Sequence, residues 1–180
     1  MEDVLALLGF STIMGGLWNA VSYAAFVGII VGVFSERYRN RLIMFGAAVL
    51  AVYAGVFLKN PLFATLQTLI VISGLAHMMW LRRPAAMAVM TVLTSTAYAF
   101  LYASGAIVDA WALAGSFGLL GIAFGLITLP HRSGFILMAL GGVALVAYAF
   151  HVGAWVFFLL NIFFAVANIH TWRKNRGVSA

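Results

Sequence analysis

Residues 61–83 read PLFATLQTLIVISGLAHMMWLRR, a long apolar run with a proline at its start and two arginines at its end. Its length is close to the roughly 20 residues that a helix needs to cross the hydrocarbon core of a bilayer. A helix can cross there because it satisfies its backbone hydrogen bonds internally. The stretch therefore predicts a transmembrane helix, and Gln67 is the one amide side chain within it.

The same pattern recurs along the rest of the chain. The charged residues leave seven apolar segments, at residues 14–34, 42–58, 62–81, 86–104, 110–128, 134–151 and 153–171. The three prolines fall at segment ends, where proline can start or stop a helix. Residues 2–12 form a short extra stretch that we expect to lie at the interface or to extend the first helix. We therefore expect an all-α membrane protein with seven transmembrane helices.

Composition points to the same class of protein. Hydrophobic residues make up 65% of the chain and charged residues 8%, against about 45–50% and about 25% in soluble domains. Lipid must therefore be the solvent for much of the surface, and we expect a multi-pass protein of the inner (plasma) membrane. The chain has no cysteine, which excludes disulfides and thiolate chemistry.

The basic residues are distributed unevenly about these segments. With seven helices, nine of the ten Lys and Arg residues fall on one side, and only Lys59 falls on the other. Basic residues concentrate on the cytoplasmic side of membrane proteins. This predicts that the N-terminus is outside and the C-terminus inside. The net charge of +6 is then explained by topology, and we expect no nucleic-acid partner.

The first three segments resemble the last three at an offset of about 93 to 95 residues. The matched positions are Ser22 and Ser116, Tyr53 and Tyr148, and Gln67 and Asn161, and both copies end in a tryptophan followed by basic residues, at Trp80 and Trp172. The one additional segment between the two sets gives both copies the same orientation in the membrane. We therefore expect a 3+1+3 arrangement of parallel repeats, with residues 1–84 as the first repeat, 85–105 as a linker helix and 106–180 as the second.

This plan is similar to that of the PnuC-type vitamin transporters and of SWEET-like seven-helix transporters. The closer likeness is to PnuC, in the stretch that leads to Gln67 and in the endings at Trp80 and Trp172, each followed by basic residues. It covers residues 14–174 in plan, but only the third and seventh helices in motif. The chain lacks the closely spaced tryptophans of PnuC and the Pro-Gln pair of SWEET proteins. The resemblance implies the fold, and it implies transport of a small metabolite.

Several polar residues inside the predicted helices are candidates for solute binding. Gln67 and Asn161 could bind a solute from both sides of a pathway, or could hydrogen-bond across helices as structural contacts. Trp18 and Asn19 could stack on and orient a planar solute, or Trp18 could be an interfacial anchor. The further candidates are Tyr53, Tyr148 and Asn168.

His77 and His170 lie near the basic ends of the matched helices, where we expect a role as a gate. A haem between two histidines needs their rings on opposite faces of one macrocycle, and the sequence gives no sign of that geometry. No nucleophile elbow, phosphate loop or His-Glu metal motif is present. We therefore expect no cofactor, no metal site and no enzyme activity.

Two functional hypotheses follow from these residues. The first is a facilitator for a small neutral polar or aromatic metabolite, such as a vitamin, nucleoside or sugar. No Asp or Glu lies inside a predicted helix, which argues against proton coupling through a carboxylate. The alternative is a non-transporting subunit of a larger membrane complex. The expected partners are membrane lipids, a small solute and, for the alternative, other membrane subunits.

Overall fold

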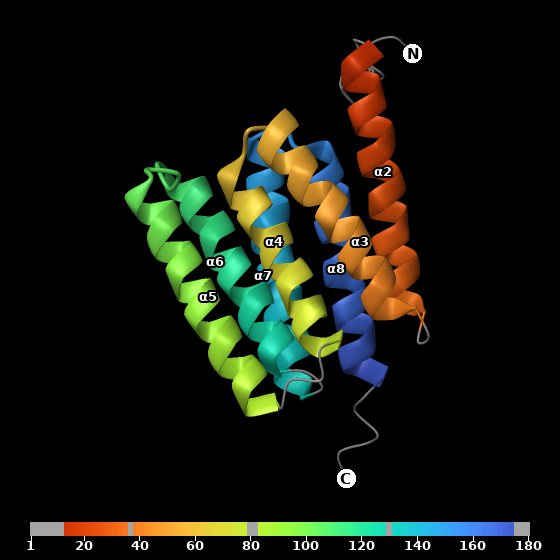
Figure 1. Ribbon diagram of the computed structural model, residues 1–180, viewed down its shortest axis with the longest axis vertical. Helices are drawn as coiled ribbons and strands as arrows, with labels where there is room; N and C mark the ends of the chain where they lie inside the picture. The colour runs from red at the N-terminus through yellow and green to blue at the C-terminus, as the bar shows by residue number, and fades with distance from the viewer. Residues whose placement is uncertain (1–12, 36–37, 79–82, 129–130, 175–180) are drawn as a thin grey trace.

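The computed structural model describes residues 13–35, 38–78, 83–128 and 131–174. Within these residues the protein is entirely helical, and successive helices run up and down the molecule in turn (Figure 1). The extra stretch predicted at 2–12 lies outside the described residues, as do Trp80 and the side chain of His77.

The helices are α2 (Ile13–Phe34), α3 (Arg39–Val52) continued by the π-helical turn η1 (Tyr53–Phe57), α4 (Pro61–Met78), α5 (Arg83–Ala103), α6 (Ala110–Thr128), α7 (Arg132–His151) and α8 (Trp155–Lys174). Each of the seven predicted segments corresponds to one helix, with α3 and η1 together forming the second. No predicted bound differs from the observed one by more than three residues. The prediction of an all-helical fold with seven helices is confirmed for the described part of the chain.

In the described part of the chain, four helices are long and apolar enough to cross a membrane, over Gly15–Gly32, Pro84–Ala103, Arg132–His151 and Trp155–Lys174. Three shorter apolar stretches lie at Arg41–Phe57, Pro61–Ala76 and Ala110–Leu126. Large apolar side chains such as Leu17, Val92 and Leu140 are more than half exposed, which water disfavours and lipid does not. The fold is that of a membrane-embedded helical bundle.

The helices pack as two sets of three, which we call the first half (α2–α4) and the second half (α6–α8). Within each half, neighbouring helices in the sequence pack on each other, and α5 packs on α4 and α6 (Figure 1). Between the halves, α4 packs on α6 and α2 packs on α8. The third helix of each half thus contacts the first helix of the other.

The connections α3–α4, α5–α6 and α7–α8 lie together at one end of the bundle, uppermost in Figure 1. We call it the Lys59 end, and the opposite end, with Arg132 and Arg173, the arginine end. Each of the three connections contains one residue in the left-handed region, namely Lys59 (φ 50°), Gly105 (φ 69°) and Gly153 (φ 68°). Such a residue ends a helix and lets the chain reverse over a few residues.

Candidate functional site

A chain of aromatic rings runs through the bundle near its Lys59 end. Its links, between ring centroids, are Trp18 to Phe57 (6.5 Å), Phe57 to Tyr53 (5.4 Å), Tyr53 to Phe157 (6.2 Å), Phe157 to Phe63 (4.2 Å) and Phe63 to Tyr148 (5.2 Å). These rings come from α2, η1, α8, α4 and α7. Offset and tilted ring contacts of this kind are favourable beyond the area that they bury. The ring chain therefore ties the two halves together.

The centre of this chain is the pair Phe63 and Phe157, both without exposed surface. Their rings are nearly parallel, at 6°. Each is the third residue of its helix, α4 or α8, and the two positions are 94 residues apart. Tyr53 stacks on Phe157 and Tyr148 packs on Phe63. Tyr53 and Tyr148, matched in the sequence, thus flank the phenylalanine pair from its two sides.

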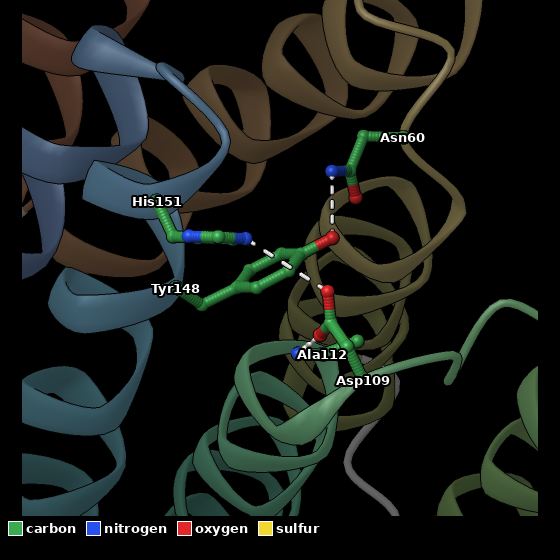
Figure 2. Close-up of polar contacts among 5 residues, drawn as sticks. All are labelled: Asn60, Asp109, Ala112, Tyr148 and His151. Atoms are coloured by element: carbon green, nitrogen blue, oxygen red, sulfur yellow. Dashed lines mark hydrogen bonds and ion pairs between the residues drawn. The ribbon is translucent and has the colours of Figure 1, made fainter.

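Each flanking tyrosine hydroxyl is hydrogen-bonded to an asparagine. Tyr53 donates to Oδ1 of Asn19, which is 3% exposed, over 2.5 Å. Nδ2 of Asn60 donates to the hydroxyl of Tyr148 over 2.9 Å (Figure 2). The first bond lies within the first half, and the second joins the two halves. Buried hydroxyls need such partners because an unpaired polar group in an apolar interior is costly.

Gln67 and Asn161 lie directly on the arginine side of the ring chain. Gln67 follows Phe63 by four residues and Asn161 follows Phe157 by four, which places each on the same helix face, one turn further. Their exposed fractions are 1% and 3%. Nδ2 of Asn161 donates to the carbonyl of Phe157 over 2.7 Å. Oε1 of Gln67 is buried and has no hydrogen-bond partner among the described residues.

A second polar cluster lies at the Lys59 end, beside the Asn60–Tyr148 bond (Figure 2). Oδ1 of Asp109 accepts a hydrogen bond from the backbone N–H of Ala112 over 2.7 Å, and Oδ2 lies 3.8 Å from Nε2 of His151. Both side chains are close to half exposed. The ring of His151 stacks on Trp111 at 5.1 Å. Such an exposed pair contributes little to stability, so the main structural effect of Asp109 is to cap α6.

The other predicted site residues are distributed along the bundle. Trp18 is partly buried at the end of the ring chain, and Asn168 (8% exposed) donates to the carbonyl of Phe164 in its own helix. His170 is exposed near the arginine end of α8. The structure therefore brings Asn19 and Tyr53 into contact, sets Gln67 next to the ring chain, and leaves His170 well away from it.

Sequence reasoning missed Asn60, Asp109 and His151. Two of these had a readable signal, because Asn60 precedes Pro61 and Asp109 precedes Ala110 at the starts of α4 and α6. Asparagine and aspartate before a helix are typical N-caps, and proline is typical of the first helical position. Their contacts with Tyr148 and His151 depend on the tertiary fold and have no such signal.

No family model, curated protein or solved structure matches the chain. Within the described residues, no three His, Cys, Asp or Glu side chains are grouped so as to hold a metal ion. The fold and site define a helical membrane bundle of two three-helix halves, joined by stacked rings, with buried amides beneath them.

Proposed function

We propose that the protein is a membrane facilitator for a small neutral polar or aromatic metabolite. The observation that carries this proposal is the buried side-chain oxygen of Gln67, which no donor satisfies among the described residues. Leaving an acceptor buried and unpaired costs roughly 1–3 kcal/mol. A solute with an N–H or O–H group would supply the missing donor. This cost favours the binding of a ligand that can donate a hydrogen bond to Gln67.

Several matched details support a 3+1+3 repeat about an axis along the membrane normal. Ser22 and Ser116 are both fully buried, and both donate to the carbonyl three residues earlier. Lys59 and Gly153, 94 residues apart, both adopt the left-handed conformation. Parallel-repeat transporters place the substrate site near the midplane, at the repeat interface. Gln67 and Asn161 are each the seventh residue of their helix, α4 or α8, between the ring chain and the middle of the bundle.

The ring chain then closes the pathway on the Lys59 side of the amides. Phe63 and Phe157 fill the space between α4 and α8 one turn from Gln67 and Asn161. A solute in contact with the amides would lie next to this aromatic cluster, which suits a planar or aromatic molecule. We propose that the Lys59 end faces outward in the inner membrane, with the N-terminus out and the C-terminus in.

A thermal-shift screen of the detergent-purified protein against nucleosides, vitamins and sugars tests the proposal. A ligand that binds the folded state raises its unfolding temperature with concentration. We expect at least one compound to do so, and Gln67→Leu to abolish the shift. Gln67→Leu should itself raise the unfolding temperature of the empty protein, because it removes an unpaired buried oxygen.

Thr94→Val is the matched control. Thr94 is fully buried in α5, and its hydroxyl has no hydrogen-bond partner among the described residues. This variant should also stabilise the empty protein, yet keep the response to solute. A solute response that survives Gln67→Leu would contradict the role of Gln67. A folded protein that responds to no compound would favour the alternative, a non-transporting subunit, which should then co-purify with other membrane proteins.

A further inference from the structure

Arg132 and Trp172 form a contact at the arginine end that the proposed function does not use. Arg132 is the first residue of α7, and Trp172 lies in the last turn of α8. The guanidinium carbon of Arg132 lies 5.5 Å from the centre of the Trp172 ring system. A guanidinium over an indole face is attracted by the ring's negative face and is held in a fixed orientation.

The charge of this guanidinium is not neutralised within the described part of the protein. The Nε atom of Arg132 is buried and donates to no acceptor there. Arg173 and Lys174 are exposed in the last turn of α8 and add two positive charges. Asp109, the one acidic residue among those described, lies at the opposite end, and Glu36 is outside the described residues. A partly buried cation with an unused donor favours the binding of an anion.

The surface beside this cation is apolar. Ile136 and Leu140 follow Arg132 at intervals of four residues along α7, and they are 40% and 64% exposed. Residues spaced by four lie on one helix face, so this stripe leads from Arg132 toward the middle of the bundle. Ile169, three residues before Trp172 on α8, is also exposed. A ligand that extends along this stripe must have a long apolar chain.

We propose that Arg132, Trp172, Arg173 and Lys174 bind the phosphate of an anionic phospholipid whose acyl chain lies along Ile136 and Leu140. Arginine binds phosphate through two parallel N–H groups. Tryptophan favours the level of the lipid headgroups, and basic pockets at the ends of membrane helices bind anionic lipid headgroups. The apolar stripe of Ile136 and Leu140 favours a lipid over free phosphate, because free phosphate has no acyl chain to lie along it. This inference is independent of solute transport.

The test uses native mass spectrometry and thermal unfolding of the purified protein with phosphatidylglycerol, phosphatidylcholine or inorganic phosphate. Phosphatidylglycerol should bind and raise the unfolding temperature, and the other two should not. Arg132→Gln should weaken phosphatidylglycerol binding about fivefold, the effect of one basic residue at an anionic surface. Lys59→Gln, which removes one charge from the opposite end, should leave binding unchanged.

The site is supported if Arg132→Gln binds phosphatidylglycerol about fivefold more weakly than the wild type and Lys59→Gln binds it equally well. Equal binding by the wild type and Arg132→Gln, an equal effect of phosphatidylcholine, or an equal effect of inorganic phosphate would overturn it. Should Arg132→Gln fail to fold, Arg132→Lys keeps the charge but lacks the planar, two-pronged donor. Its phosphatidylglycerol binding should fall below that of the wild type, and wild-type binding by this variant would equally overturn the proposal.

Discussion

Asn60 makes two hydrogen bonds that act at different levels of the structure. Its Oδ1 accepts from the backbone N–H of Phe63 over 3.1 Å, which caps the first turn of α4. Its Nδ2 donates to the hydroxyl of Tyr148, which lies 88 residues away in the second half. One side chain therefore fixes where α4 begins and also joins the two halves of the bundle.

The two bonds of Asn60 can be separated by substitution. Asn60→Ser keeps an acceptor for the cap but has no second polar arm to reach Tyr148, so it should cost about 1 kcal/mol of unfolding free energy. Asn60→Ala should cost about 2 kcal/mol, because it loses the cap as well. Both values are measured by unfolding in mixed detergent micelles.

Tyr148→Phe supplies the control for this pair. Combined with Asn60→Ser it should cost little more than either change alone, since both remove the same bond. Additive costs in the double variant would show that the Asn60–Tyr148 bond contributes nothing to stability.

At the scale of helices, the stretch from the matched tyrosine to the left-handed residue is one residue longer in the first half than in the second. Tyr53 and Tyr148 are 95 residues apart, but Lys59 and Gly153 are 94 apart. The extra residue of the first half lies between Tyr53 and Lys59, where the chain forms the π-helical turn η1. A π-turn accommodates one additional residue in an otherwise α-helical rod. This accounts for the shift in offset and keeps Tyr53 and Tyr148 in equivalent contacts with the phenylalanine pair.

The packing of α6 on α7 depends on two glycines that allow close approach of their backbones. A Cβ on Gly141 would lie 2.6 Å from the carbonyl oxygen of Gly118, and one on Gly118 would lie 2.8 Å from that of Gly141. Small residues let membrane helices approach in this way.

Gly141→Ala should therefore destabilise the protein by about 1–3 kcal/mol, the usual range for overpacking a close contact. Gly28→Ala is the control, because a Cβ at Gly28 would meet nothing within 4 Å. It should be neutral, or stabilising by up to about 1 kcal/mol through helix propensity. Thermal unfolding in detergent measures both, and equal effects of the two changes would contradict the close contact.

At the scale of the whole molecule, the sequence was enough to predict the seven helices and most of their bounds. Apolar length and flanking charge are local properties, and α6 spans the predicted residues 110–128. Gln67 and Asn161, identified in the sequence as polar positions inside their helices, are both buried. The ring chain was not predicted, because stacking of Phe63 on Phe157 depends on how α4 and α8 are placed in space. The lack of a hydrogen-bond donor for Oε1 of Gln67 among the described residues likewise depends on how the helices pack in space.

The proposed orientation can be tested on the whole molecule, because the chain has no cysteine that would give background labelling. Ser104→Cys places a thiol at an exposed position of the Lys59 end, and Lys174→Cys places one at the arginine end. In intact cells a membrane-impermeant maleimide should label Ser104→Cys, and it should label Lys174→Cys only after permeabilisation. The reverse pattern would place the N-terminus inside.

The ring chain also gives the protein an intrinsic optical label. Near-ultraviolet circular dichroism of aromatic side chains depends on fixed tertiary packing and is lost when that packing loosens. The rings from Trp18 to Tyr148 form one connected series, and its last three links, from Tyr53 through Phe157 and Phe63 to Tyr148, each join one half to the other. A separation of the halves would therefore change the near-ultraviolet spectrum while the far-ultraviolet helical signal stays constant, so movement could be followed in solution without attaching a dye.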